Sequence, residues 1–482
     1  MRLIFIGLLT LLFVTFMPVF AENKVKLEII YPKNNAIINA SSMFIVGNTE
    51  PNSDLLINNQ TVKVYSNGAF VQMISLSNGI NNINIKSQKG HAVNEITYTI
   101  TVPESKNTYL PVVSPDPISV VAEITKDYAV TRTYPEQNRL TPLLQGTILN
   151  ITGKLGTSYR FKYSDSMDGW ISENDIKILS DGNCLYESLI NTLNIDSDEN
   201  YVYLKLPLTQ KIPFLIDQSS ENQMNLKLFG VKAGINLFSY NNASDFIKEL
   251  KWTQESNNCL NLSIKTNSKQ FWGYKYYYEG NTLILKLKKP PHVDVNYPLK
   301  GKIICLDAGH GGTELGAVGP TAVPEKLINL GIANNLRKIL EKKGAKIIMT
   351  RDSDKEVGLY DRVDLANSNE AQVIISIHNN SLPDGKNPYE EHGTSTYYYH
   401  PQSLPLAKSI QQSLVPTMEF KDLGLINRSF VLTRPTEALS VLVEVGFMIN
   451  PYEYNLLITP EFQKKAAIGI SQGMENFFLS QL

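Results

Sequence analysis

The C-terminal part of the sequence contains a small set of side chains whose types could bind a metal ion and move a proton. They are His310, Glu325, His378 and Glu444. Two neutral imidazoles and one carboxylate can hold Zn²⁺ tetrahedrally and leave the fourth position to a water molecule, which the metal acidifies. A second carboxylate that does not bind the metal can then accept a proton from that water. We therefore predict that His310, Glu325 and His378 bind Zn²⁺ and that Glu444 is the catalytic acid/base.

The residues around these side chains indicate which elements position them. Apolar, β-branched runs lie at 303–306, 373–375 and 439–442, and a His or Glu of the set follows each run. Such runs are typical of buried parallel strands, and the ligands of an open α/β sheet collect beyond the carboxyl ends of its strands. The set is too widely spaced for a single helical zinc motif, so we expect separate strands and loops to assemble the site.

The expected burial of Glu444 supports its assignment. Val443 and Val445 flank it within a run that should be buried, where an unpaired carboxylate is costly. A nearby metal ion, or a catalytic role with a raised pKa, explains a carboxylate at such a position. We expect Asp307, just before the glycine-rich loop, to fix that loop or to orient a metal-bound imidazole.

Four short motifs follow one another in this stretch: DAGHGG at 307–312, PEKLINL at 324–330, SIHNN at 376–380 and VEVGF at 443–447. In this order they resemble the zinc-dependent N-acetylmuramoyl-L-alanine amidases, cell-wall hydrolases that cut between muramic acid and the stem peptide. The resemblance covers the chain from about residue 300 to its C-terminus. It implies the same roles as the chemistry does: zinc ligands in the first three motifs and the acid/base in the last.

The sequence departs from that family's pattern in two places. Glu314 stands where the family commonly has Asp, a change that we expect to be tolerated. The loop 381–393 is short, whereas some relatives insert a helix there that covers the zinc. We therefore predict an open site that needs no activator. His392, within this loop, could replace a metal ligand only if the loop folded over the site.

The length of 482 residues predicts several domains, since single cores seldom grow beyond about 250 to 300 residues. We predict a multidomain fold in which three small, mainly β domains precede a C-terminal α/β catalytic domain, a mixed sheet with helices on both faces. The predicted division is a signal peptide at 1–21, an immunoglobulin-like β-sandwich at 24–102, a proline-rich linker at 103–118, a barrel resembling bacterial Src-homology-type domains at 119–180, a β domain similar to amidase N-terminal domains at 198–289, and the zinc amidase domain at 300–482.

Local patterns give further expectations. The catalytic domain is predicted to have helices at 326–343, 359–367 and 460–479 and a strand at 430–433. Residues 180–200 are predicted to be a connection or a short helix. The aromatic stretch 272–278 could stack on sugar rings, although packing on its own sheet is the commoner role of such a stretch.

The N-terminus and the overall charge indicate location and partners. Arg2, an apolar stretch from 3 to 16 and the small residues before 22 are typical of a secretory signal peptide, and an uncleaved anchor is the alternative. We expect cleavage, secretion to the cell wall and no lasting membrane anchor. The formal net charge of −1 gives no electrostatic footprint for nucleic acid.

Together these predictions describe a secreted zinc hydrolase that cuts the amide bond between N-acetylmuramic acid and L-alanine in peptidoglycan, its expected partner. Two alternatives stay open: a wall-binding scaffold whose catalytic fold is inactive, and a zinc peptidase that cuts within the stem peptide.

Overall fold

The computed structural model describes residues 24–104, 114–182, 188–240 and 245–482. The predicted signal peptide, residues 1–21, lies outside these described residues. The chain is divided between two compact units. The first unit holds the residues up to Glu104 together with Pro320–Ala322 and Asp384–Lys386, and the second unit holds all the others.

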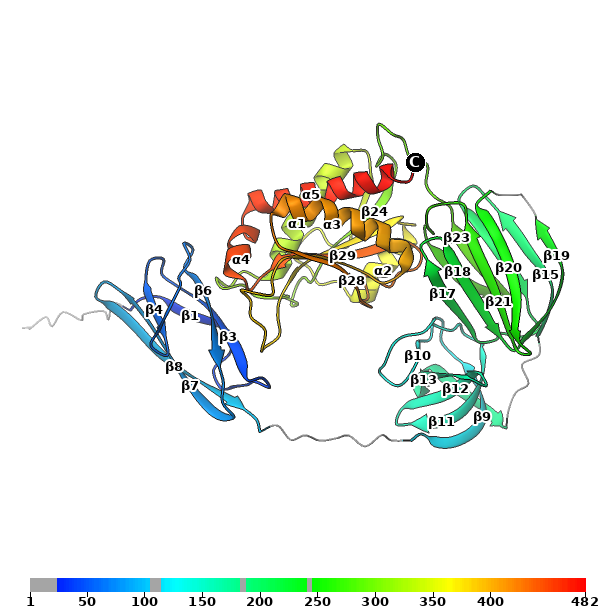
Figure 1. Cartoon of the computed structure of the whole chain (residues 1–482), viewed down its shortest axis with the longest axis horizontal. Helices are drawn as coiled ribbons and strands as arrows, with labels where there is room; N and C mark the ends of the chain where they lie inside the picture. Colours follow the sequence, from blue (N-terminus) through cyan, green and yellow to red (C-terminus); the bar gives the residue numbers. More distant parts are fainter. Residues whose placement is uncertain (1–23, 105–113, 183–187, 241–244) are drawn as a thin grey trace, which may run out of the picture. The chain divides into compact units, whose positions relative to one another are not determined.

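The first unit contains a β-sandwich (Figure 1). One sheet has the strand order β1-β3-β6 and the other the order β2-β8-β7-β4-β5. Side chains from both sheets, among them Ile45, Phe70 and Ile85, share one apolar core. The strands are β1 (Leu27–Tyr31), β2 (Ala36–Ile37), β3 (Ser42–Thr49), β4 (Asp54–Ile57), β5 (Gln60–Val62), β6 (Ala69–Ser75), β7 (Gly79–Lys89) and β8 (Ala92–Val102).

The second unit begins with a six-stranded sheet of order β10-β13-β12-β11-β9-β14. Its core includes Leu149, Phe161 and Tyr163, which belong to the same apolar cluster as the residues of the strands that follow in the chain. The elements are β9 (Asp116–Ile124), β10 (Thr131–Arg132), β11 (Ile148–Leu155), β12 (Ser158–Ser164), β13 (Met167–Ser172), the short 3₁₀ helix η1 (Glu173–Asp175) and β14 (Ile176–Asp181).

Two further sheets of the second unit pack on each other, with orders β19-β15-β16-β23-β22 and β17-β18-β21-β20. Period-two alternation explains the packing, because Leu226 and Leu228 of one sheet and Leu285 and Leu287 of the other enter one core. The strands are β15 (Ser188–Ser197), β16 (Tyr201–Pro207), β17 (Phe214–Ser220), β18 (Gln223–Phe229), β19 (Val231–Tyr240), β20 (Ile247–Ser256), β21 (Cys259–Thr266), β22 (Tyr274–Glu279) and β23 (Thr282–Lys288).

The C-terminal part is a six-stranded mixed sheet of order β25-β24-β26-β29-β27-β28. The first four strands of this order run parallel, whereas β27 runs antiparallel to β29. The strands are β24 (Ile303–Ala308), β25 (Lys346–Met349), β26 (Val373–Asn380), β27 (Thr394–Tyr398), β28 (Asp422–Asn427) and β29 (Leu439–Phe447).

Helices cover both faces of this sheet. Ile304 and Leu306 of β24 face a large cluster with three long helices, while Cys305 points to the opposite face and packs near Ala366 of α2. Figure 1 shows α1, α3 and α5 over one face, where α5 packs against both others. The helices are α1 (Glu325–Lys342), α2 (Leu359–Ser368), the 3₁₀ helix η2 (Pro401–Ser403), α3 (Leu404–Met418), α4 (Pro451–Leu457) and α5 (Pro460–Leu479).

The expected C-terminal α/β architecture and the mainly β character of the upstream residues are therefore confirmed. Two local predictions are wrong. Residues 188–197 form β15 within a sheet rather than a connection. Residues 430–433 form a turn, because the Thr433 hydroxyl accepts a hydrogen bond from the Phe430 amide (2.9 Å) and donates one to the Arg428 carbonyl (2.6 Å).

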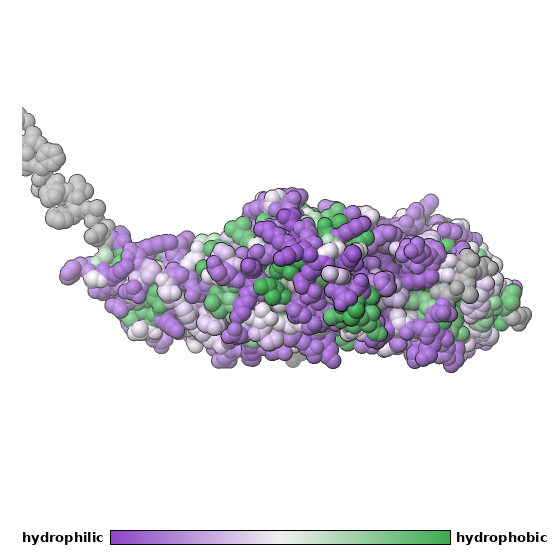
Figure 2. All heavy atoms as spheres, turned by 90° about the horizontal axis from the view of Figure 1, so that it is seen from above, coloured by the Kyte–Doolittle hydropathy of each residue, from purple (hydrophilic) through white to green (hydrophobic). Residues whose placement is uncertain are grey.

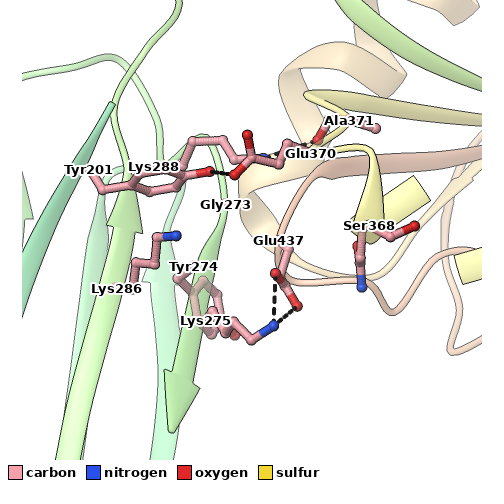
Figure 3. A pocket seen from close by; sticks show the side chains of 11 residues that line it. Tyr201, Gly273, Tyr274, Lys275, Lys286, Lys288, Ser368, Glu370, Ala371 and Glu437 are labelled. Carbon is pink, nitrogen blue, oxygen red and sulfur yellow. Dashed lines mark hydrogen bonds and ion pairs between the residues drawn. The ribbon is translucent and has the colours of Figure 1, made fainter. Parts of the chain in front are cut away.

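Strand β22, which holds most of the aromatic stretch, is joined to the segment just before β29 of the C-terminal sheet (Figure 3). The Tyr274 amide donates to the Thr436 carbonyl (2.7 Å), and Lys275 Nζ lies 3.2 Å from Glu437 Oε1. Trp272 is fully buried in the catalytic core, with its ring 5.6 Å from that of Phe477. Stacking of Trp272 on a sugar is therefore ruled out, and packing explains this part of the stretch.

The surface in Figure 2 is mostly hydrophilic, with apolar residues in separate patches. Within the part of the chain that the structure describes, none of the helices combines the length and the apolar character needed to cross a bilayer.

Candidate metal centre and active-site cleft

Four elements bring the predicted site residues together. His310 follows the carboxyl end of β24, Glu325 is the first residue of α1, and His378 lies near the end of β26. Glu444 lies on β29, directly opposite His378 in the parallel register of the two strands. The sheet therefore places Glu444 beside the three candidate metal ligands, as expected for residues near the carboxyl ends of neighbouring parallel strands.

His310, Glu325 and His378 offer ligand atoms that all lie within 4.8 Å of one another. His310 Nε2 is 3.2 Å from Glu325 Oε2, and His378 Nδ1 is 3.0 Å from Glu325 Oε1. The two imidazole rings are 4.9 Å apart at 79°. Two nitrogens and one oxygen in this arrangement fit the donor set of a catalytic zinc ion.

The electrostatics of the three residues also favour a cation. Burial alone would raise the pKa of Glu325, but hydrogen bonds with His310 and His378 hold this pKa well below its usual range. Burial alone would lower the pKa of His378, but the adjacent Glu325 carboxylate raises it to about 9. The negative charge of Glu325 would stabilise either a proton on this imidazole or a metal ion bound in its place.

Glu325 is held by neighbours that the sequence analysis did not single out. Its Oε1 accepts hydrogen bonds from Asn329 Nδ2 (3.0 Å) and from the Asn379 amide (3.1 Å), and its Oε2 accepts one from the Ala317 amide (2.9 Å). Asn329 is fully buried, one helical turn after Glu325. In the sequence, the i, i+4 spacing of this carboxylate and this amide is the signal from which the contact could have been predicted.

Asp307 fixes the loop, which is one of its two expected roles. Its carboxylate accepts hydrogen bonds from Thr350 Oγ1 (2.7 Å), Arg362 Nη1 (2.7 Å) and the Ser376 hydroxyl. Arg362 in turn donates to the Ala308 and His310 carbonyls, both at 2.9 Å. Burial would raise the pKa of Asp307, but the Arg362 charge outweighs it and keeps this pKa low.

Two glycines leave room for the candidate metal ligands. A Cβ at Gly309 would lie 2.2 Å from His378 Cε1, and a Cβ at Gly316 would lie 2.4 Å from Glu325 Oε2. Gly316 also has a φ of +68°, and His310 itself has a φ of +61°. The loop after β24 therefore needs glycine where it approaches the imidazole and the carboxylate.

Glu444 faces the same cleft as His310 and His378. Burial raises the pKa of Glu444 to about 8; the charge of His378 opposes the shift and that of Glu325 adds to it. Its Oε2 is buried and has no hydrogen-bond partner among the described residues. A carboxyl group with this pKa can both accept and donate a proton near neutral pH.

The cleft has a volume of about 540 Å³. Its outer walls come from 356–359, just before and at the start of α2, and from 429–434, the segment that includes the turn described above. The loop 381–393 contains no helix or strand, and none of its carboxylates joins the ligand group found among the described residues. The open site stays a prediction that these observations support.

The remaining histidines lie elsewhere. His392 Nδ1 pairs with the buried Glu453 (2.7 Å) and does not belong to the ligand group. His91 and His292 are exposed. His400 is partly buried, and its Nε2 is 2.9 Å from the Arg434 carbonyl oxygen.

Comparison with known proteins places this site in a family. A family model described as N-acetylmuramoyl-L-alanine amidase matches residues 304–476. A second model, domain B of glucodextranase, matches residues 25–105, of which 25–104 belong to the first unit.

Individual relatives match the same C-terminal region. The germination-specific N-acetylmuramoyl-L-alanine amidase of Bacillus subtilis (strain 168) is 36% identical over 199 residues, which are 38% of this chain and 81% of that protein. Uncharacterized protein YqiI of the same organism is 34% identical, covering 40% of this chain and 93% of its own length. Among solved structures, the catalytic domain of the amidase CwlV from Bacillus (Paenibacillus) polymyxa var. colistinus is 33% identical with a TM-score of 0.35, over 38% of this chain and 99% of that one. Because these sequence relatives match over most of their own length, this chain belongs to the N-acetylmuramoyl-L-alanine amidase family.

Proposed function

We propose that this chain is a secreted, zinc-dependent hydrolase that cleaves the amide bond between N-acetylmuramic acid and L-alanine in peptidoglycan. The observation that carries the proposal is the meeting of Glu444 with the group His310, Glu325 and His378 at one cleft. Family membership supports the bond that is cut, and the His₂Glu donor set supports zinc.

The residues of the chain divide the work as follows. His310, Glu325 and His378 would hold the zinc ion, which supplies Lewis acidity and makes water a stronger acid when it is bound. Glu444 accepts the proton of the attacking water and later donates it to the departing amine. Its buried position and its pKa of about 8 suit both steps. Asp307, Arg362 and Asn329 keep the loop and the ligands in place.

The upstream residues would hold the enzyme on its polymer. The three β domains and their ranges, 24–102, 119–180 and 198–289, are part of this proposal, with the third extended to include β15. Binding of one module to the wall raises the local concentration of the catalytic site at its substrate. Secretion rests on the apolar N-terminal stretch of the sequence.

Digestion of purified muropeptides with the full chain, followed by mass spectrometry, tests the reaction. We expect release of intact stem peptides with a free N-terminal alanine. Glu444→Gln should lower the rate by about 10²- to 10⁴-fold while zinc, measured by plasma emission, stays bound. Glu461→Gln, an exposed position at the start of α5, is the matched control and should cut at the normal rate.

The same experiment separates the alternatives. Products cut within the stem peptide would identify a peptidase. A zinc-free protein without any product would identify a scaffold. Unchanged turnover by Glu444→Gln would refute its assigned role.

A further inference from the structure

A second, larger cavity of about 1020 Å³ continues the cleft. The two cavities share Val431 and Arg434, so the segment 429–437 forms a wall of both. Helix α2 forms the facing wall: Leu359 lines the cleft and Tyr360 lines the larger cavity. A linear substrate bound at Glu444 can therefore extend along one continuous groove.

The far end of this groove is built by the upstream β sheets of the second unit. Arg139 and its neighbours up to Pro142 line it. Two hydrogen bonds fix this loop to β17, from the Ile216 amide to Thr141 Oγ1 (2.8 Å) and from Thr141 Oγ1 to the Ile216 carbonyl (3.2 Å). Tyr276 of β22 also donates to the Pro142 carbonyl (3.0 Å). Arg139 is therefore presented by a fixed loop rather than by a free end.

Arg434 is also held in place by hydrogen bonds, at the end of the groove that joins the cleft. Its Nη1 donates to the Ser429 carbonyl (3.1 Å) and lies 3.4 Å from Ser429 Oγ. Its own carbonyl oxygen is 2.9 Å from His400 Nε2. Both arginines are half-buried. Both line the same cavity. Burial and the positive charge of Arg139 lower the pKa of Arg434, whereas a side-chain hydrogen bond with Tyr360 opposes this shift.

The acidic residues of the cavity do not neutralise this pair. Glu437 forms an ion pair with Lys275. Asp217 and Asp364 also line the cavity, but none of the ion pairs among the described residues joins either of them to Arg139 or Arg434. Two guanidinium groups that line one cavity without a carboxylate partner repel each other and favour an anion between them.

We propose that Arg139 and Arg434 form a subsite that binds the carboxylates of the stem peptide, on the leaving-group side of the scissile amide. This inference rests on the proposed function, because it takes the peptide attached to the cleaved bond as the ligand. An extended peptide advances about 3.3 Å per residue, so a few residues suffice to pass from the cleft into the groove. Guanidinium groups bind carboxylates with two parallel hydrogen bonds, which suits this ligand better than an uncharged glycan strand.

The test compares two soluble muramyl-peptides, one with free stem carboxylates and one with the same carboxylates amidated, cut by the full chain. We expect the KM for the acidic peptide to be about tenfold lower, and Arg139→Ala or Arg434→Ala to remove this preference while the kcat changes little. Arg434→Lys keeps the charge and should recover part of it. Lys126→Ala, which removes an exposed positive charge of the same upstream sheet region, is the control and should keep the preference.

Equal KM values for both peptides in the unaltered chain, or a normal preference in Arg139→Ala, would overturn the subsite. If neither peptide is cut, the proposed reaction fails instead. Calorimetric binding of the two peptides to Glu444→Gln then decides on the subsite: tighter binding of the acidic peptide that Arg139→Ala abolishes supports it, and equal binding rejects it.

Discussion

At the scale of single residues, hydrogen bonds from neighbouring side chains and amides hold the candidate metal ligands in place. His310, Glu325 and His378 stand out because their side chains are rare ligand types at the ends of apolar runs. Arg362 and Asn329 do not, because their importance lies in which carbonyls and carboxylates they reach after folding. Arg362 lies 52 residues after His310 and leaves no local pattern, whereas Asn329 follows Glu325 at the i, i+4 spacing.

The metal site gives a prediction that uses two histidines of the same domain. His378→Ala removes one of three ligands, so zinc affinity should fall by at least tenfold, measured with a competing chelator. His392→Ala is the matched control, since its imidazole contacts Glu453 and not the ligand group. This variant should keep its zinc, although the buried Glu453 carboxylate loses its imidazole partner and keeps the Phe447 amide, which should lower its stability. Equal zinc loss in both variants would contradict the assigned ligands.

At the scale of elements, periodicity predicted α1, α2 and α5 well but did not predict α3, the third long helix. The pattern placed a helix at 326–343, and α1 spans Glu325–Lys342. The error at 430–433 has a different origin. Apolar β-branched residues favour a strand there, but the Thr433 hydroxyl takes over backbone hydrogen bonds and closes a turn. That turn lines the cleft, so the misread segment is one that matters for binding.

Trp272 gives the prediction that belongs to this scale. It lies in the segment between β21 and β22 but packs against Phe477 and Phe478 of α5. Trp272→Ala should cost about 3 to 5 kcal/mol of unfolding free energy, measured by urea titration, because it leaves a cavity in the core. Trp252→Ala, on β20 and 37% exposed, is the control, with a much smaller expected loss. Similar losses in the two variants would show that Trp272 is not a core residue.

At the scale of the whole molecule, composition predicts a division into modules but does not predict how the modules are attached. Proline-rich and turn-rich stretches indicate where a module ends. They carry no information about which side chain crosses into the next core. The second unit shows such a crossing, because Trp272 completes the catalytic core and Tyr274 shares a backbone hydrogen bond with Thr436.

Shortened chains test this attachment. A chain that begins at residue 290 lacks Trp272 and the Lys275–Glu437 ion pair, whereas one that begins at residue 188 keeps both. We expect the shorter chain to unfold at a temperature lower by several degrees in calorimetry. Coinciding transitions would mean that the catalytic domain is complete without the strands before it.

The direct pairing of His378 with Glu444 in adjacent strands has a consequence for control. Strands within a sheet are held about 4.8 Å apart by their backbone, so no domain closure is required to bring the proposed metal ligand and the proposed proton carrier side by side. Under the proposed roles this pair is ready for catalysis at all times. We therefore expect control to come from the access of the enzyme to its polymer rather than from a rearrangement within the site.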